Sequence, residues 1–204
     1  MKKLGINKTK IFEVTPDNFL FSGITYFASP NQDDRPIGIK PEIIVIHGIS
    51  LPPGDFVNDN IKDFFLNRLN HKEHSYFESI KDLKVSSHLL IDRNGILSQF
   101  VPLNKRAWHA GSSCYQGTSN CNDFSIGIEL EGQDHIDYTE LQYRCLVKVA
   151  QSLMHFYPII DARKIVAHSD IAPTRKTDPG PSFDWFKLYE YMDNEQSADI
   201  SLVK

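Results

Sequence analysis

Apolar positions along this chain recur with two different periods, which predict strands in some segments and helices in others. Residues 43–46, Ile-Ile-Val-Ile, form a continuous β-branched run that is too short for most helices and is typical of a strand buried on both faces. Residues 164–167 are a second short strand candidate, and residues 125–131 alternate apolar and polar side chains, as a strand with two distinct faces does. In that alternation, Glu129 and Glu131 project from the same face.

A β-hairpin and three helices complete the expected elements. Residues 85–91 and 96–101 are strand-like runs on either side of a turn that contains Asn-Gly, a strong hairpin signal. Thr139 followed by Gln142 matches a capping box, which predicts a long helix that begins there and continues up to Pro158. Helical spacing of apolar residues also appears in two further segments, 60–69 and 183–192.

The order of these elements predicts the fold class. Strands interspersed with helices indicate an α/β (α+β) domain with a central mixed β-sheet flanked by helices. The chain has 204 residues, and a single hydrophobic core can grow to roughly 250 residues before chains tend to split. We therefore expect one domain at residues 41–192, with an N-terminal extension at 1–40 and a C-terminal tail at 193–204.

Net charge argues against two classes of partner. The formal charge is -4 and the isoelectric point is near 6.0, without a dense run of Lys or Arg. Such a chain has little attraction for phosphate backbones or anionic lipid surfaces. No stretch approaches the roughly 18 continuous apolar residues of a membrane span. We expect neither a nucleic acid nor a membrane as a partner.

Two features point to the cytoplasm. The start, Met1-Lys2-Lys3, imitates the basic beginning of a secretory signal, but polar residues at positions 7, 8, 10 and 13 interrupt any apolar stretch. The three cysteines, at 114, 121 and 145, cannot all pair within one chain and form no CxxC metal motif. We expect no export signal and reduced thiols.

Candidate chemistry comes from histidines at strand ends. Of the eight histidines, His47 and His168 directly follow short strands, where clefts form in α/β sheets, and Asp178 follows ten residues after His168 in a proline-rich loop. Two histidines and one carboxylate are an established catalytic zinc set that leaves a fourth position for water. Zinc lowers the pKa of that water to about 7. Glu129 fits the carboxylate that takes its proton, and Lys176 fits a cation that stabilises an oxyanion.

Each of these residues also has an ordinary structural interpretation. A histidine at a strand end is more often a hydrogen-bonded core residue than a ligand, and an aspartate before a proline is commonly a turn residue. Glu129 and Glu131 also fit the solvated side of an edge strand, and Lys176 beside Arg175 fits surface solvation. Composition and spacing by themselves leave the function open.

Several segments, read together, resemble the zinc-dependent N-acetylmuramoyl-L-alanine amidase family. The resemblance runs in family order from about Pro41 to Trp185. It is closest to the cytoplasmic branch that acts on 1,6-anhydro-muramyl peptides, because the last segment extends through Ser-Phe-Asp-Trp. The matching segments are VIHGISLPPG (45–54), VSSH (85–88), RAWHAG (106–111), NDFSIGIELEG (122–132) and KTDPGP (176–181).

The resemblance implies a peptidoglycan-recognition-protein-like fold and an assignment for each site residue. It implies that His47, His168 and Asp178 bind Zn²⁺, that Glu129 activates the water and that Lys176 stabilises the oxyanion. Trp108, His109 and His88 are then expected to contact the substrate. Family members often have a tyrosine just before the equivalent of His88, and Ser87 in this chain shifts the acid–base role to Glu129.

The implied reaction is hydrolysis of the bond between the lactyl group of (1,6-anhydro)-N-acetylmuramic acid and L-alanine, during peptidoglycan recycling. We expect a monomer whose partner is a small-molecule muropeptide. Two alternatives remain at this point. One is a binding module, because relatives of this fold recognise peptidoglycan without cutting it, although such receptors typically lack a complete ligand set. The other is a secreted amidase or phage lysin that acts on intact wall.

Overall fold

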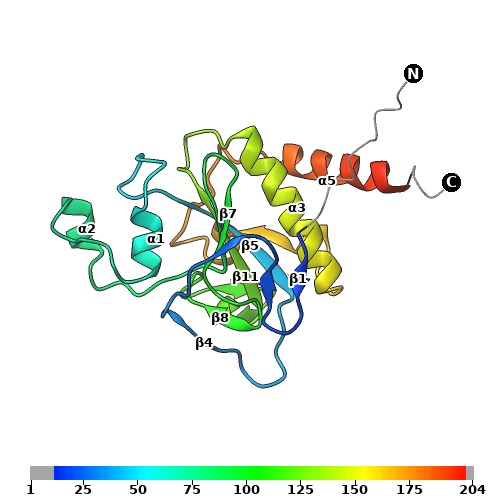
Figure 1. Ribbon diagram of the computed structural model, residues 1–204, viewed down its shortest axis with the longest axis horizontal. Helices are drawn as coiled ribbons and strands as arrows, with labels where there is room; N and C mark the ends of the chain where they lie inside the picture. The colour runs from blue at the N-terminus through cyan, green and yellow to red at the C-terminus, as the bar shows by residue number, and fades with distance from the viewer. Residues whose placement is uncertain (1–11, 201–204) are drawn as a thin grey trace.

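The computed structural model describes residues 12–200, and its centre is a six-stranded mixed sheet, which Figure 1 shows between the helices. The first four strands in spatial order run parallel, the next pair forms an antiparallel hairpin, and the last strand is parallel to its neighbour. The predicted central mixed sheet is therefore confirmed. In spatial order the strands are β12 (Ile165–Ala167), β5 (Ile43–Ile49), β11 (Ser125–Glu131), β6 (Leu89–Ile91), β7 (Leu97–Gln99) and β3 (Thr25–Tyr26).

The two faces of the sheet carry different side chains. On β11, Ile126, Ile128 and Leu130 belong to the same buried cluster as Leu146 and Val149 of helix α3 (Glu140–Phe156). The intervening residues of β11 point to the opposite face, because side chains alternate along a strand. That opposite face contains Ser125, Gly127 and Glu129. The sheet thus packs one face on α3, and its other face combines polar side chains with a smaller apolar cluster that contains Ile43, Val45 and Val166.

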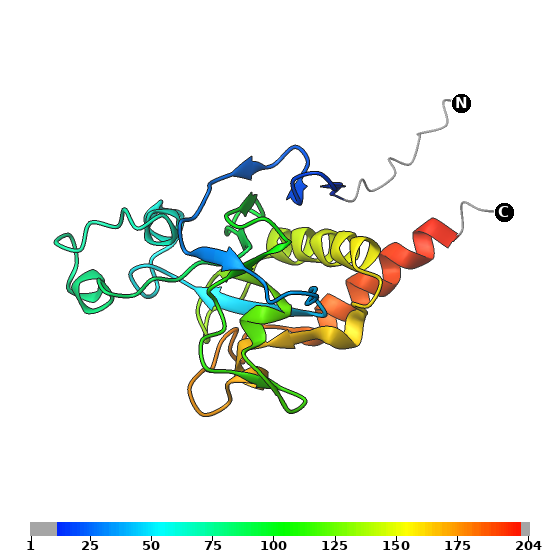
Figure 2. The ribbon, with the colours of Figure 1, turned by 90° about the horizontal axis from the view of Figure 1, so that it is seen from below.

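Helix α3 follows the sequence prediction closely. Its N-cap residue Thr139 accepts a hydrogen bond from the backbone N–H of Gln142, and the Gln142 side chain accepts one from Thr139 N. This reciprocal arrangement satisfies two of the donors that a helix start otherwise leaves unpaired. Helix α5 (Trp185–Ile200) packs against α3, as Figure 2 shows.

The predicted hairpin also forms, with shorter strands than expected. The carboxylate of Asp92 accepts hydrogen bonds from the backbone N–H groups of Asn94 and Ile96 at 2.9 and 2.8 Å. Gly95 has φ +73°, and a Cβ there would lie 2.6 Å from the Leu141 carbonyl oxygen. The turn therefore requires glycine both for its backbone conformation and for its approach to α3.

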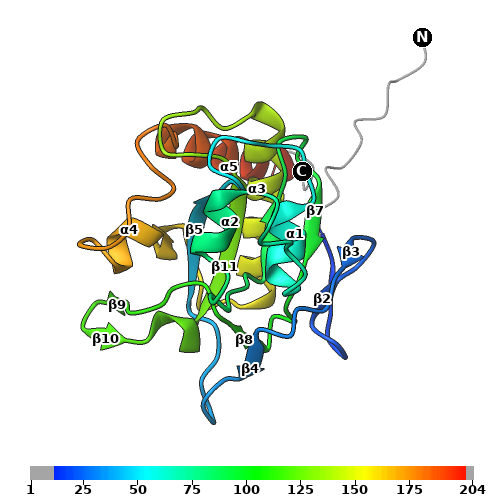
Figure 3. The same ribbon diagram turned by 90° about the vertical axis from the view of Figure 1, so that its left-hand side faces the viewer.

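Two helices lie at the rim of the sheet, and Figure 3 shows them in front of it. Helix α1 (Asn60–Phe65) is shorter than the predicted 60–69, because Asn67 adopts the left-handed conformation at φ +57°. Helix α2 is Ser75–Ser79. The remaining short elements are β1 (Val14–Thr15), β2 (Leu20–Phe21), β4 (Gln32–Asp34), β8 (Lys105–Ala107), β9 (Cys114–Tyr115), β10 (Thr118–Ser119), α4 (His168–Ile171) and the 3-10 helices Cys121–Asp123 and Ala162–Lys164.

The structure includes parts of both the predicted N-terminal extension and the predicted C-terminal tail. Strand β3 joins the central sheet, and Val14 and Phe21 belong to the α3 cluster, so the segment before residue 40 packs on the domain. Helix α5 extends through most of the predicted tail. Residues 1–11 and 201–204, which begin and end these two predicted regions, lie outside the described residues, and the division at 40 and 192 stays a prediction.

Within residues 12–200, the helices are too short or too polar to cross a lipid bilayer.

Candidate metal centre

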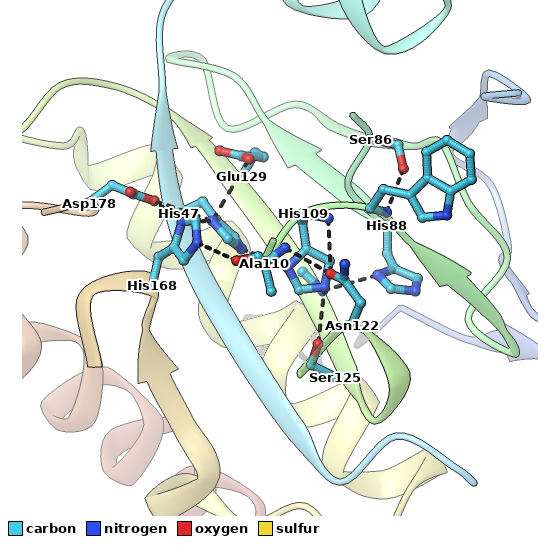
Figure 4. Close-up of polar contacts among 12 residues, drawn as sticks. His47, Ser86, His88, His109, Ala110, Asn122, Ser125, Glu129, His168 and Asp178 are labelled. Carbon is cyan, nitrogen blue, oxygen red and sulfur yellow. Dashed lines mark hydrogen bonds and ion pairs between the residues drawn. The ribbon is translucent and has the colours of Figure 1, made fainter. Parts of the chain in front are cut away.

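Strand register brings the three predicted metal ligands to one place. His47 lies on β5, Ala167 of β12 pairs with Ile46, and His168 follows immediately at the start of α4. Parallel strands present their carboxyl ends at the same edge of a sheet, so the two histidines become neighbours although 121 residues separate them. Asp178 comes from the loop after α4. The Nδ1 atoms of His47 and His168 lie 2.9 Å apart, and Oδ2 of Asp178 lies 3.2 and 3.0 Å from them (Figure 4).

This geometry fits a tetrahedral zinc ion. Donor atoms at about 2.0–2.1 Å from a tetrahedral ion lie roughly 3.3 Å from one another, close to the separations of these three atoms. The Nε2 atom of His168 lies 3.1 Å from the Ala110 carbonyl, which can only accept a hydrogen bond, so Nε2 carries the ring proton. Nδ1 of His168 therefore directs a lone pair at His47 and Asp178. A cation held by the three atoms would satisfy that lone pair.

Burial and ion pairing favour the ligand forms of these side chains. Burial lowers the pKa of His47 to about 4, so the imidazole is neutral near pH 7. Burial alone raises the pKa of the Asp178 carboxyl, but hydrogen bonds with His168 and His47 outweigh it and hold the pKa well below its usual range. His47 is therefore a neutral imidazole and Asp178 a carboxylate, the forms in which these side chains bind zinc.

Glu129 lies beside the three ligand atoms. It pairs with His47 in the β5–β11 register, and its Oε1 is 4.0 Å from His47 Nδ1. The residue is only 8% exposed, and its Oε2 has no hydrogen-bond partner among the described residues. Burial, and then the nearby Asp178 carboxylate, raise the pKa of Glu129 well above its ordinary value. A buried carboxylate of raised pKa is a suitable proton acceptor. The edge-strand interpretation is wrong, because β11 pairs on both sides.

The second glutamate of β11 has a different task. Glu131 is 2% exposed, and its two oxygens accept hydrogen bonds from the backbone N–H groups of Val57 at 2.6 Å and Arg93 at 3.0 Å. Through these two hydrogen bonds, Glu131 connects the loop before α1 with the hairpin turn. The same strand therefore carries one unpartnered carboxylate oxygen near the ligands and one fully bonded structural carboxylate.

A cleft of about 320 Å³ opens over these groups. Lys176 lines it together with Glu129 and the three candidate ligands, and its positive charge acts to lower the pKa of both His47 and Glu129. The opposite part of the lining is mainly apolar and comes from the α1 and α2 region: Leu51, Phe64, Phe65, Tyr76, Ile80, Leu83 and Val85.

The three residues expected to contact substrate have different positions. His109 lines the cleft but is only 9% exposed. His88 is fully buried, with Nδ1 accepting from Gly127 N at 3.0 Å and Nε2 3.1 Å from the Lys105 carbonyl, and it does not line the cleft, because both ring nitrogens are committed inside the domain. Trp108 is partly buried and hydrogen-bonds Asp33. Contact of Trp108 with a substrate stays a prediction.

Two further contacts at this centre could not be predicted from the sequence pattern. His109 Nδ1 lies 2.8 Å from Nε2 of His47, and the Ala110 carbonyl accepts from His168. A backbone carbonyl has no residue-type signal. The single sign in the sequence is that His109 and Ala110 belong to the WHAG element, whose histidine we expected to contact substrate instead.

Comparison with known proteins identifies the family. The 1,6-anhydro-N-acetylmuramyl-L-alanine amidase AmpD of Enterobacter cloacae is 49% identical over 173 residues, 85% of this chain and 92% of the relative. A crystal structure of a selenomethionine AmpD derivative has a TM-score of 0.83 at 48% identity and covers 85% of this chain and 97% of its own.

A more distant structure contains a ligand. It is a complex of the N-acetylmuramyl-L-alanine amidase AmiD from E. coli with the substrate anhydro-N-acetylmuramic acid-L-Ala-D-γ-Glu-L-Lys. It has a TM-score of 0.53 at 33% identity over 76% of this chain and 60% of its own. The sequence profile of the N-acetylmuramoyl-L-alanine amidase family matches residues 37–181. With the ligand triad, the neighbouring carboxylate and these matches in agreement, this chain belongs to the N-acetylmuramoyl-L-alanine amidase family.

Proposed function

We propose that this protein hydrolyses the amide bond between the lactyl group of 1,6-anhydro-N-acetylmuramic acid and L-alanine, with zinc held by His47, His168 and Asp178. The observation that carries the proposal is the convergence of three donor atoms within 4.8 Å of one another, with Glu129 beside them. A relative that is 49% identical is named for this activity, and the AmiD complex contains such a substrate.

The roles of the side chains follow from their positions. Zinc bound at these ligands would supply a water of pKa about 7 and polarise the scissile carbonyl. Glu129 accepts the proton of the attacking water and passes it to the leaving nitrogen of L-alanine, which restores the carboxylate. Lys176, on the cleft wall, provides the positive charge that stabilises the developing oxyanion. Amide cleavage then yields a lactyl carboxylate and a free peptide amine.

The surroundings of the site support a small soluble substrate. A cleft of about 320 Å³ suits a fragment of a few sugar and peptide units, and its apolar lining from Phe64, Tyr76 and Ile80 offers a surface for the sugar or the alanine methyl group.

We place the reaction in the cytoplasm during peptidoglycan recycling. The free cysteines, Cys114, Cys121 and Cys145, are compatible with a reducing compartment. We expect the enzyme to act as a monomer.

Mass spectrometry of the purified protein with anhydro-muramyl tripeptide tests the proposal. Zinc-loaded protein should release free tripeptide, and a sample stripped with a chelator should not, until zinc is returned. Intact sacculi serve as a parallel substrate. Binding of the muropeptide without cleavage, at stoichiometric zinc, would favour a binding module, and preference for sacculi would favour a wall-degrading amidase.

A further inference from the structure

Both candidate ligand histidines have their outer ring nitrogens occupied by two consecutive residues. Nε2 of His47 lies 2.8 Å from Nδ1 of His109, and Nε2 of His168 lies 3.1 Å from the carbonyl oxygen of Ala110 (Figure 4). The inner nitrogens, both Nδ1, face each other and Asp178. One short segment therefore contacts both ligands on the side away from the metal.

The direction of each hydrogen bond follows from the ligand role. A neutral imidazole carries one proton, so a ring that offers the Nδ1 lone pair to a metal must carry its proton on Nε2. His47 then donates from Nε2 to Nδ1 of His109, which must be unprotonated. His109 in turn carries its own proton on Nε2, which lies 3.1 Å from Oγ of Ser125. When a metal is bound, the two hydrogen bonds therefore run in one direction, with His47 donating to His109 and His109 donating to Ser125.

The ring of His109 is held rigidly in this position. Oδ1 of Asn122 accepts from the backbone N–H of His109 at 3.1 Å and of Ala110 at 2.8 Å. The ring packs directly on Gly127, where a Cβ atom would lie 2.5 Å from Cγ of His109. Ser125, at the end of the chain, is fully buried, so bulk water does not compete for its hydroxyl.

We propose that His109 is a positioning residue for the metal centre: it accepts the Nε2 proton of His47, with Ser125 as the next acceptor, and so orients the Nδ1 lone pair of His47 toward zinc. The proposal rests on the ligand set of the proposed function. It assigns His109 to the metal rather than to the sugar, although the residue borders the cleft. Partners that orient a ligand histidine typically change metal affinity roughly 10- to 100-fold when they are replaced.

Three variants separate this role from simple packing. His109→Phe keeps a ring of similar size on Gly127 but removes the acceptor. His109→Asn is smaller, yet its Oδ1 is as many bonds from Cα as Nδ1 of histidine and restores an acceptor. Ser125→Ala removes the hydroxyl that receives the His109 proton. A packing role predicts that Phe is the milder change at 109, whereas the positioning role predicts that Asn is.

Zinc affinity, measured by competition with a chromophoric chelator, is the decisive readout. Thermal unfolding of the metal-free variants by circular dichroism shows which of them are folded. We expect His109→Phe to lose roughly 10- to 100-fold in zinc affinity, His109→Asn to recover most of that loss, and Ser125→Ala to lose affinity in the same direction. Nitrogen-15 NMR of the zinc-loaded wild type should show His109 protonated at Nε2.

The outcomes distinguish the positioning role of His109 from the zinc ligand set on which it depends. Wild-type zinc affinity in folded His109→Phe, or a proton on Nδ1 of His109 in the zinc-loaded protein, overturns the positioning role and leaves the ligand set intact. If His109→Phe does not fold, the other two variants decide. The positioning role is then overturned if Ser125→Ala binds zinc with wild-type affinity and folded His109→Asn binds zinc weakly. Absence of stoichiometric zinc binding by the wild type overturns the ligand set itself, and this proposal with it.

Discussion

Replacing Glu129 with glutamine should move catalytic activity and metal-free stability in opposite directions. The substitution preserves the size of the side chain beside His47 but removes its charge and its ability to accept a proton. Glu129 Oε1 is 4.0 Å from His47 Nδ1, and its Oε2 is buried without a partner among the residues that the structure describes. In the metal-free protein, therefore, the ionised carboxylate is poorly compensated.

The loss of activity follows from the role of a general base. Such groups contribute about 10²- to 10⁴-fold, which corresponds to about 3–5 kcal/mol of transition-state stabilisation. The zinc ligands are untouched, so the variant should keep a full complement of metal while kcat falls by this factor.

The effect on stability follows from the raised pKa of Glu129. Between the ordinary carboxyl pKa of 4.5 and the raised folded value, the folded state binds more protons than the unfolded state. Metal-free wild type therefore loses stability as pH rises through that interval, and Glu129→Gln does not. At pH 7 the metal-free variant should be more stable than the wild type, whereas below pH 4.5 the two should converge.

Glu131→Gln is the matched control, because it makes the same chemical change two positions along the same strand. Its oxygens accept from the backbone of Val57 and Arg93, so glutamine turns an amide donor toward one of these N–H groups. That variant should lose about 1–3 kcal/mol of stability. Urea unfolding of chelator-treated proteins, with tripeptide release by mass spectrometry, gives both quantities. Near wild-type turnover in Glu129→Gln, or a loss of stability like that of Glu131→Gln, would refute the reasoning.

Three other outcomes are expected. His168→Ala should lower zinc content, measured by atomic emission, and full occupancy would show that the ligand set is wrong. Lys176→Met should reduce kcat by roughly 10²- to 10³-fold with zinc retained, and an unchanged kcat would exclude its oxyanion role. The Arg106 guanidinium holds the pKa of Asp33 below its ordinary 3.8. The Asp33–Arg106 ion pair therefore stabilises the fold above pH 3.8, and this stabilisation is lost as the pH falls through the lowered pKa of Asp33. Asp33→Asn should cost on the order of 0.5–1 kcal/mol at pH 7, because the pair is partly exposed and screened. In urea titrations, the difference in unfolding free energy between the wild type and Asp33→Asn should become smaller at acid pH. A difference that does not change with pH would contradict this prediction.

Strong local signals in the sequence predicted the main elements of the fold. The β-branched run of β5, the alternation of β11, the Asn-Gly turn and the capping box of Thr139 each depend on nearest neighbours along the chain, so the sequence reveals them directly. Strands β1 to β4 and β8 to β10 are two or three residues long and have no measurable period. Strands β3, β4 and β8 could not be predicted because they form through pairing with distant parts of the chain, and the β1–β2 and β9–β10 hairpins are too short to show a local pattern.

For the centre itself, the sequence determined which side chains can serve as ligands and, through family motifs, which of them are expected to bind metal. Residue type and position in a motif are enough to name His47, His168, Asp178 and Glu129. The tertiary structure alone decided which nitrogen of each histidine faces inward. The proton position on His47 depends on His109, which lies 62 residues away in sequence and 2.8 Å away in space. Hydrogen-bond direction is a property of atoms in contact. Those contacts exist only in the folded chain, where β12 lies beside β5 and the segment after β8 packs its His109 ring on Gly127 of β11.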